Sequence, residues 1–187
     1  MLYLIAGASK SGKSIIAKRI LAQKNLPYLS LDWLVMGFTN GVPEYGLHDK
    51  LMPDEIAERI WPFLQAMLDN MLFAEVDYVI EGEAILPELI TGLLKKYPGQ
   101  IKIGFLGYAD VDRQQKFNVI KTYRNEKDDY WLLSESDNYI YQHIDNMITF
   151  SRRLEKDCAK YGMDYFETAS DFMGVLERAK KLLLSKQ

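Results

Sequence analysis

The sequence predicts an α/β fold in which a mostly parallel sheet carries helices on both faces. Short apolar runs of β type alternate along the 187 residues with longer segments of helical spacing. A glycine-rich loop at residues 7–14 separates the first apolar run from the first helical segment. The hydrophobic share of 48% is large enough for one real core, so we expect a single domain over residues 1–187. Strands that alternate with helices in this way favour a parallel sheet, because the connections between its strands are helical.

The expected strands are short apolar segments, and the expected helices carry apolar residues three and four positions apart. The strands are Leu2–Ala6, Pro27–Ser30, Tyr78–Ile80, Ile101–Leu106 and a short one near Asp164–Glu167. The helices are Lys13–Gln23, Asp54–Phe73, Pro87–Lys96, Val111–Arg124, Glu135–Tyr161 and Asp171–Ser185. Pro62 interrupts one helical pattern and predicts a kink or a break near Trp61, because proline cannot donate the helical hydrogen bond.

Two stretches do not fit this framework. Phe38–Asp49 contains three glycine or proline residues and joins the second strand to the next long helix. Glu126–Asn138 is dense in charged and aromatic residues. Loops of this length in a compact domain are usually either functional or disordered. The aromatic content of both stretches disfavours simple disorder, so both are expected to have a function.

The loop after the first strand fits the phosphate-binding pattern G-x-x-x-x-G-K-[ST] at every constrained position. It reads Gly7-Ala8-Ser9-Lys10-Ser11-Gly12-Lys13-Ser14. A strand, such a loop and a helix in this order aim backbone N–H groups and a helix dipole at one point. The two glycines permit the tight turn, the lysine can reach the terminal phosphates, and the serine hydroxyl can ligate Mg²⁺. The chain is therefore expected to bind a nucleoside triphosphate through these eight residues.

Acidic residues stand where the second and third strands end. Asp32 follows the second strand, and Glu81 and Glu83 flank Gly82 after the third. A carboxylate beside a phosphate loop can hold Mg²⁺ or accept a proton from an acceptor hydroxyl. Asp32 is equally suited to cap a helix over Trp33–Gly37. The alternative for Glu81 is a solvated strand end, and Glu83 can simply begin a turn.

A cationic helix face is expected in the segment Val111–Arg124. Arg113, Phe117, Ile120 and Arg124 are spaced four, three and four apart, so they share one face. Arginine suits phosphate because its planar fork donates two hydrogen bonds at once. Alternatively, both arginines extend over apolar surface or pair with nearby acids.

Composition narrows the class of protein and its partners. The net charge of −3 argues against a general nucleic-acid binder, and no apolar run approaches the length of a membrane span. A single cysteine, Cys158, excludes an intrachain disulfide, and with only His48 and His143 a histidine metal site is not expected. Arg152 and Arg153 are expected on a solvated helix face, and the alternative is that either reaches phosphate from behind the lid. We expect a cytoplasmic protein, monomeric or homodimeric, with no nucleic-acid or membrane partner.

The chain resembles the small-molecule branch of the P-loop kinases, which includes the adenylate, shikimate, gluconate and nucleoside kinases. The resemblance rests on the phosphate loop, on Asp32 after the second strand, on the step Glu81-Gly82 and on the order of elements. It implies the three-layer P-loop NTPase fold, a five-stranded parallel sheet ordered 2-3-1-4-5, and a helical lid. It also implies an acceptor-binding segment at about residues 32–75, a lid at about 111–138, and a nucleotide-base loop that includes Ser170.

The resemblance has gaps that leave the acceptor open. The glycine-rich second-carboxylate loop of shikimate kinases is missing, and Glu81 stands where an aspartate is more common. The lid has no compact pair of arginines separated by three residues.

The leading hypothesis is an ATP-dependent phosphotransferase that acts on a small metabolite or nucleoside-like acceptor. Its catalytic residues would be Lys13, Asp32 and a lid arginine, with Mg²⁺ on Ser14 and Glu81, and Asp32, Gly82 and Glu83 would contact the acceptor. The alternatives are a nucleotide switch or NTPase that acts with a protein partner, and an RNA-directed or toxin-like kinase, which the acidity disfavours.

Overall fold

The structure is a computed structural model that describes residues 1–122, 132 and 134–185. Its strands form one parallel five-stranded sheet in the order β2-β3-β1-β4-β5, which confirms the expected topology. The strands are β1 Leu2–Gly7, β2 Tyr28–Ser30, β3 Tyr78–Gly82, β4 Ile101–Gly107 and β5 Tyr165–Glu167. β1 lies in the middle of the sheet, so the phosphate loop that follows it leaves the centre of the carboxyl edge.

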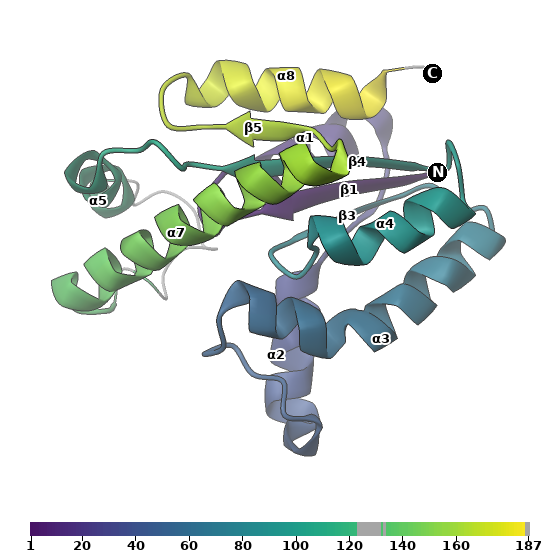
Figure 1. Cartoon of the computed structure of the whole chain (residues 1–187), viewed down its shortest axis with the longest axis horizontal. Coiled ribbons are helices and arrows are strands. Elements are labelled where there is room, and N and C mark those ends of the chain that lie inside the picture. The colour runs from purple at the N-terminus through teal and green to yellow at the C-terminus, as the bar shows by residue number, and fades with distance from the viewer. Residues whose placement is uncertain (123–131, 133, 186–187) are drawn as a thin grey trace.

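Helices cover both faces of the sheet (Figure 1). They are α1 Lys13–Lys24, α2 Leu31–Gly41, α3 Pro53–Phe73, α4 Pro87–Lys96, α5 Arg113–Thr122, α7 Asp137–Tyr161 and α8 Phe172–Leu184, and a short 3₁₀ turn, η1, spans Pro43–Tyr45. No helix among the described residues is both long and apolar enough to cross a membrane.

The core has two parts because successive side chains of a strand point to opposite faces. In β1, Leu2 and Leu4 join the larger cluster, which includes buried residues of α3, α4 and α7. Ile5 joins the smaller cluster with buried residues of α1 and α8. Figure 1 shows α8 on one side of the strands and α3 and α4 on the other. Burial on both faces explains the near-continuous apolar sequence of this strand.

Helix α3 runs through Pro62 without a break. Of the kink or break predicted near Trp61, the break was therefore wrong. Pro62 itself is exposed, and the buried residues of α3 lie on the opposite stripe: Pro53, Ala57, Ile60, Leu64, Leu68 and Leu72. Packing of that stripe offsets the one hydrogen bond that proline cannot donate, since most helical stability in proteins comes from tertiary packing.

Two other boundaries differ from the sequence prediction at positions that matter for the site. α2 extends to Gly41, so the expected loop Phe38–Asp49 begins inside a helix. The cap residue of α2 is Ser30, and Asp32 lies in the first turn, so the capping alternative for Asp32 was wrong. β3 continues to Gly82, so Glu81 lies within the strand rather than after it.

Candidate phosphate-binding site

The phosphate loop is held in a conformation that only a few residue types adopt. Gly7 and Gly12 have φ angles of 134° and 100°, and Lys10 has a φ of 57°. A Cβ atom on Gly7 would collide with the carbonyl oxygen of Leu106 in β4. The first glycine is therefore required by the neighbouring strand as well as by its own backbone angles.

Lys13 is the first residue of α1 and turns back over the loop. Its Nζ donates a hydrogen bond of 2.8 Å to the carbonyl oxygen of Ala8, and only 6% of the residue is exposed. The amide of Ser11 donates to the same oxygen at 3.3 Å. The Ala8 carbonyl thus receives two donors that are of the kind used to bind phosphate oxygens.

Glu81 brings a buried carboxylate to the first residues of α1. Its Oε1 accepts a hydrogen bond of 3.2 Å from the Ser14 hydroxyl, and the Ser30 side chain is a second hydrogen-bond partner. Burial raises the pKa of Glu81, while the positive charge of Lys13 opposes the shift. A hydroxyl and a carboxylate held together are ligands that suit Mg²⁺, so these residues fit the expected cation.

Glu83 closes the same cluster from the loop after β3. Its Oε1 lies 3.9 Å from Lys13 Nζ, and Ser9 is its hydrogen-bond partner. Burial is the main cause that raises the pKa of Glu83 to about 7, and the negative charges of Asp32 and Glu81 add to it. Asp32, Glu81 and Glu83 therefore act on one another electrostatically, as expected for carboxylates at neighbouring strand ends.

Gly82 sits between the two glutamates in close contact with α2. A Cβ atom at this position would lie 2.6 Å from the Cβ of Leu31. The glycine therefore lets the first turn of α2 pack against β3. That contact brings Asp32, on the same turn, toward the carboxylates of β3.

Lys116 is a cation near the loop that sequence reasoning missed. It lies on α5, is 8% exposed, and donates from Nζ to the carbonyl oxygen of Lys10 at 2.9 Å. Its ammonium group stands 3.9 Å from the centre of the buried Tyr108 ring. The available signal was its spacing from Ile120, since residues four apart share one helix face and both are buried.

The loop after β5 is organised by one carboxylate. Glu167 accepts hydrogen bonds from the amides of Ala109 at 2.7 Å and Ala169 at 2.8 Å, and from the Tyr165 hydroxyl at 3.0 Å. This ties the ends of β4 and β5 together at the carboxyl edge. Ser170 follows in the same loop and is exposed, so it is available to a ligand there.

Of the two expected lid arginines, Arg113 is described and Arg124 is not. Arg113 pairs with Asp145 of α7 at 2.8 Å and stacks over the Tyr141 ring at 4.5 Å. This matches the alternative in which Arg113 pairs with a nearby acid. Arg124 lies outside the described residues, as do the rest of residues 123–131 and residue 133 of the predicted lid. Phe117 of the same predicted face stacks on Tyr141, with ring centres 4.2 Å apart.

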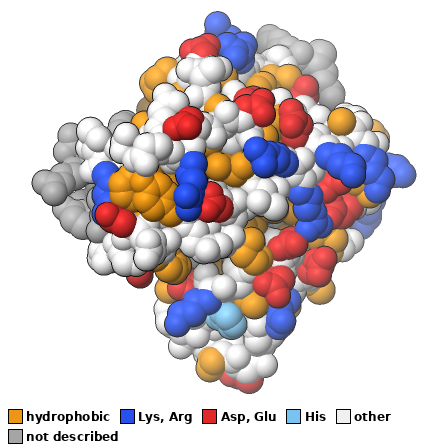
Figure 2. All heavy atoms as spheres, turned by 60° about the vertical axis from the view of Figure 1, so that its left-hand side comes forward, with side chains coloured by type: hydrophobic (Ala, Val, Ile, Leu, Met, Phe, Trp, Pro, Cys, Tyr) orange, Lys and Arg blue, Asp and Glu red, His pale blue; other side chains and the backbone are white. Residues whose placement is uncertain are grey.

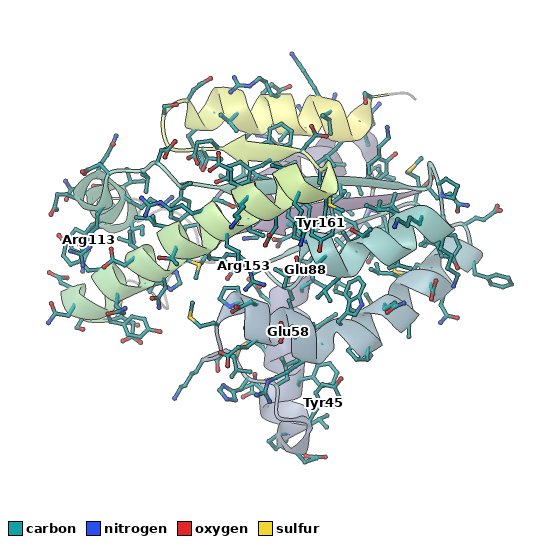
Figure 3. The ribbon with its side chains drawn as sticks, viewed as in Figure 1. Tyr45, Glu58, Glu88, Arg113, Arg153 and Tyr161 are labelled. Atoms are coloured by element: carbon teal, nitrogen blue, oxygen red, sulfur yellow. The ribbon has the colours of Figure 1, made fainter. Side chains whose placement is uncertain are left out.

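Arg153 does not lie on a freely solvated face as expected. Its guanidinium contacts Asp54 of α3 at 2.6 Å, Glu88 of α4 at 3.1 Å and Asp157 of α7 at 3.5 Å. Figure 3 shows Arg153 and Glu88 close together between α7 and α4, while Arg113 lies away on α5. Arg153 therefore joins three helices beside the core, whereas Arg152 is exposed.

The expected character of Cys158 is confirmed. Cys158 is buried and free, and burial raises the pKa of its thiol to about 12, as suits an inert core residue.

Within the described ranges, no three His, Cys, Asp or Glu side chains gather as a metal site. A magnesium ion held largely by nucleotide phosphates needs fewer protein ligands than that. Figure 2 shows acidic and basic side chains intermixed over the face it presents.

Among known proteins, the chain matches solved structures but neither family models nor curated sequences. A gluconokinase from Sinorhizobium meliloti 1021 has a TM-score of 0.56 at 17% identity, over 97% of this chain and 90% of that one. A shikimate kinase from Bacteroides thetaiotaomicron has the same TM-score and identity, over 98% of both chains. A sugar kinase from a Janibacter species has a TM-score of 0.53 at 18% identity, over 97% of this chain and 93% of that one.

These matches, the sheet order and the phosphate loop together define the fold as that of the P-loop small-molecule kinases. The resemblance seen in the sequence is thus confirmed at the level of the fold.

Proposed function

We propose that this protein is an ATP-dependent phosphotransferase that moves the terminal phosphate to a small metabolite or nucleoside-like acceptor. The observation that carries the proposal is the cluster at the carboxyl edge of the sheet, where Lys13 and Ser14 meet Glu81 and Glu83. The cluster sits on the fold of P-loop kinases. A cation, an oxygen pair suited to Mg²⁺ and further carboxylates are what phosphoryl transfer requires.

Each member of the cluster has a proposed role. Lys13 leaves the Ala8 carbonyl to contact the terminal phosphates, and the loop amides bind the remaining phosphate oxygens. Ser14 and Glu81 hold Mg²⁺, which when bound neutralises charge on the phosphate oxygens. Asp32, exposed in the first turn of α2, is the proposed base for the acceptor hydroxyl. Catalysis comes chiefly from positioning and charge neutralisation.

The acceptor is proposed to bind at the carboxyl edge of the sheet beside the first turn of α2, where Asp32 and Glu83 lie. Gly82 was also expected to contact the acceptor, but Leu31 covers it. The later turns of α2 carry an aromatic group, in which Phe38 contacts Tyr45 and Phe63 with ring centres 4.8 and 5.3 Å apart. The carboxylates suit an acceptor that bears hydroxyl groups, because they can accept its hydrogen bonds. Arg124 is the proposed lid cation, and Arg113 would first have to leave Asp145.

An acceptor screen tests the proposal. ATP turnover is measured with and without each candidate sugar, sugar acid, nucleoside and cyclic polyol, and Lys13→Ala serves as the inactive control. We expect turnover that depends strongly on one class of acceptor and disappears in the control. Turnover that no compound changes would contradict a kinase, and turnover that survives Lys13→Ala would contradict the phosphate-loop assignment.

A nucleotide switch or NTPase that acts with a protein partner is the second candidate. The observation that favours it is a set of exposed apolar side chains on α2 and α3, including Trp33 at 60%, Met36 at 42% and Phe63 at 41%. Exposed apolar surface can mark an interaction site. Acceptor-independent turnover that a bound protein accelerates would select this function instead.

A further inference from the structure

We propose that Lys116 is a positioning residue that holds the phosphate loop in its anion-binding conformation. It would do so by fixing the direction of the Lys10 carbonyl from helix α5. The inference rests on the proposed binding of nucleotide phosphates by this loop, and it adds a residue outside the loop motif to that function.

The contact joins two segments that are far apart in sequence. Lys116 Nζ donates to the Lys10 carbonyl oxygen at 2.9 Å, across 106 positions of the chain. Lys116 is 8% exposed, and its helix packs into the core through the buried Ile120. A long side chain confined in this way has few alternative positions, so the hydrogen bond is made from a fixed point.

Peptide geometry converts this contact into an orientation of the loop amides. The described chain contains no cis peptide bond, so the Lys10 carbonyl and the Ser11 N–H point in opposite directions. With the carbonyl held outward by Lys116, the Ser11 N–H faces into the loop, where it donates to Ala8 at 3.3 Å. A phosphate oxygen in the loop would take the place of that acceptor.

The backbone at Lys10 needs such support. Its φ of 57° is left-handed, a conformation that is unfavourable for residues with a Cβ atom. Alternation of left- and right-handed residues is what creates a concave nest of N–H groups. Without an outside contact, the Lys10–Ser11 peptide can turn over and present its carbonyl to the phosphates.

The environment of Lys116 is costly for a residue with a purely structural role. Its ammonium stands over the face of the buried Tyr108 ring at 3.9 Å. Burial, followed by the charges of Lys10 and Lys13, lowers the pKa of Lys116 to about 8. An apolar side chain would fill this space without the desolvation penalty of a charge. The retained ammonium is explained by its hydrogen bond to the loop.

The test separates nucleotide binding from folding. Lys116→Met keeps the apolar stem and removes the donor, and Lys121→Met on the same helix is the matched control. We measure ADP affinity, the Ser11 amide resonance of the nucleotide-free protein, and the free energy of unfolding.

In Lys116→Met we expect ADP affinity to fall about tenfold or more. The Ser11 resonance should shift, and stability should be unchanged or higher. Lys121→Met should bind ADP as the wild type does.

Two results would overturn the inference. One is ADP affinity within about twofold of wild type with an unmoved Ser11 resonance. The other is equal weakening by Lys121→Met, which would show that loss of any charge on α5 suffices. Failure of the wild type to bind ADP would instead contradict the proposed function, and the Ser11 resonance, measured without nucleotide, would still report on the contact itself.

Discussion

Glu83 Oε1 lies 3.9 Å from the Nζ atom of Lys13, so the lysine of the phosphate loop faces a carboxylate. Glu83 also has Ser9 of the loop as a hydrogen-bond partner. Both groups that Glu83 approaches are ones that a bound phosphate would use. An incoming triphosphate must therefore share Lys13 with Glu83 or displace it.

This relationship predicts the behaviour of Glu83→Gln. Removal of a negative charge beside Lys13 should tighten ADP binding by roughly severalfold, because like charges no longer oppose each other in a partly buried site. The KM for the acceptor should rise, since Glu83 is proposed to contact it. Calorimetric titration of ADP and steady-state kinetics measure the two effects. Glu44→Gln, an exposed carboxylate in η1, is the control. Weaker ADP binding in Glu83→Gln would show that Glu83 supports the phosphates instead.

Asp32→Asn should slow phosphoryl transfer far more than it weakens ATP binding. The amide keeps the shape but cannot accept the acceptor's proton, and a general base contributes on the order of 10²–10⁴-fold. Stability should change little. Asp32 is exposed in the first turn of α2 and is not its cap, so only a helix-dipole interaction of about 0.3–1 kcal/mol is lost. Single-turnover rates and thermal unfolding measure both. An unchanged rate in the folded variant would remove Asp32 from the chemistry.

The parts of the site that were predicted from sequence are local ones. Residues 7–14 carry their conformational requirements in their own side chains and in the flanking strand and helix, so the loop could be recognised without a structure. The strand order followed because the alternation of elements matched a known architecture. Asp32 and Glu81 became candidates because they lie near strand ends, although the strand that holds Glu81 is longer than expected.

The parts that were missed depend on contacts between distant segments. Lys116 appears in the sequence as an ordinary lysine of a polar helix, and only the tertiary fold places it on Lys10. Arg153 was expected to be solvated because two of its partners could not be foreseen: Asp54 on α3 and Glu88 on α4 lie 99 and 65 positions away in the sequence. Charge alone does not reveal which lysines and arginines are buried, since that is decided by packing.

His143 makes the stability of the protein depend on pH. Burial, followed by the positive charges of Lys10, Lys116 and Lys13, lowers the pKa of His143 to about 4. The unfolded chain binds this proton near pH 6.5 and the folded chain does not, so stability is lost as pH falls from about 6.5 through about 4. The loss can reach about 3 kcal/mol from this group.

His143→Gln should remove that component. The advantage of the wild type over the variant should shrink as pH is lowered from 7 to 4, as measured by urea unfolding at each pH. His48→Gln, in an exposed loop, is the control. A constant difference between wild type and His143→Gln over this range would show that His143 is protonated in the folded protein as readily as in the unfolded chain.

Arg113 is tied to α7 through its ion pair with Asp145 and its stacking on Tyr141. Its substitution by lysine should therefore act mainly on the packing of α5 against α7. A small loss of stability and a near-normal transfer rate are expected, because exposed ion pairs contribute at most about 1 kcal/mol.

Arg124 should behave differently, because we propose that it acts in the transition state. It follows Phe117 and Ile120 on one face of the predicted helix, and packing of that face would carry the guanidinium toward the phosphates on closure. Charge on a transferring phosphoryl group is best met by a forked donor, and an arginine of this kind can contribute about 10³-fold or more to the rate. Lysine keeps the charge and loses the two-point geometry, so Arg124→Lys should remain substantially impaired. ATP affinity should barely change, since the contact is made only during transfer.

Single-turnover rates for Arg124→Lys and Arg124→Ala, beside the same pair of substitutions at Arg113, decide between the two residues. A larger rate loss at Arg113 would move the role there, because breaking its pair with Asp145 would then be part of closure.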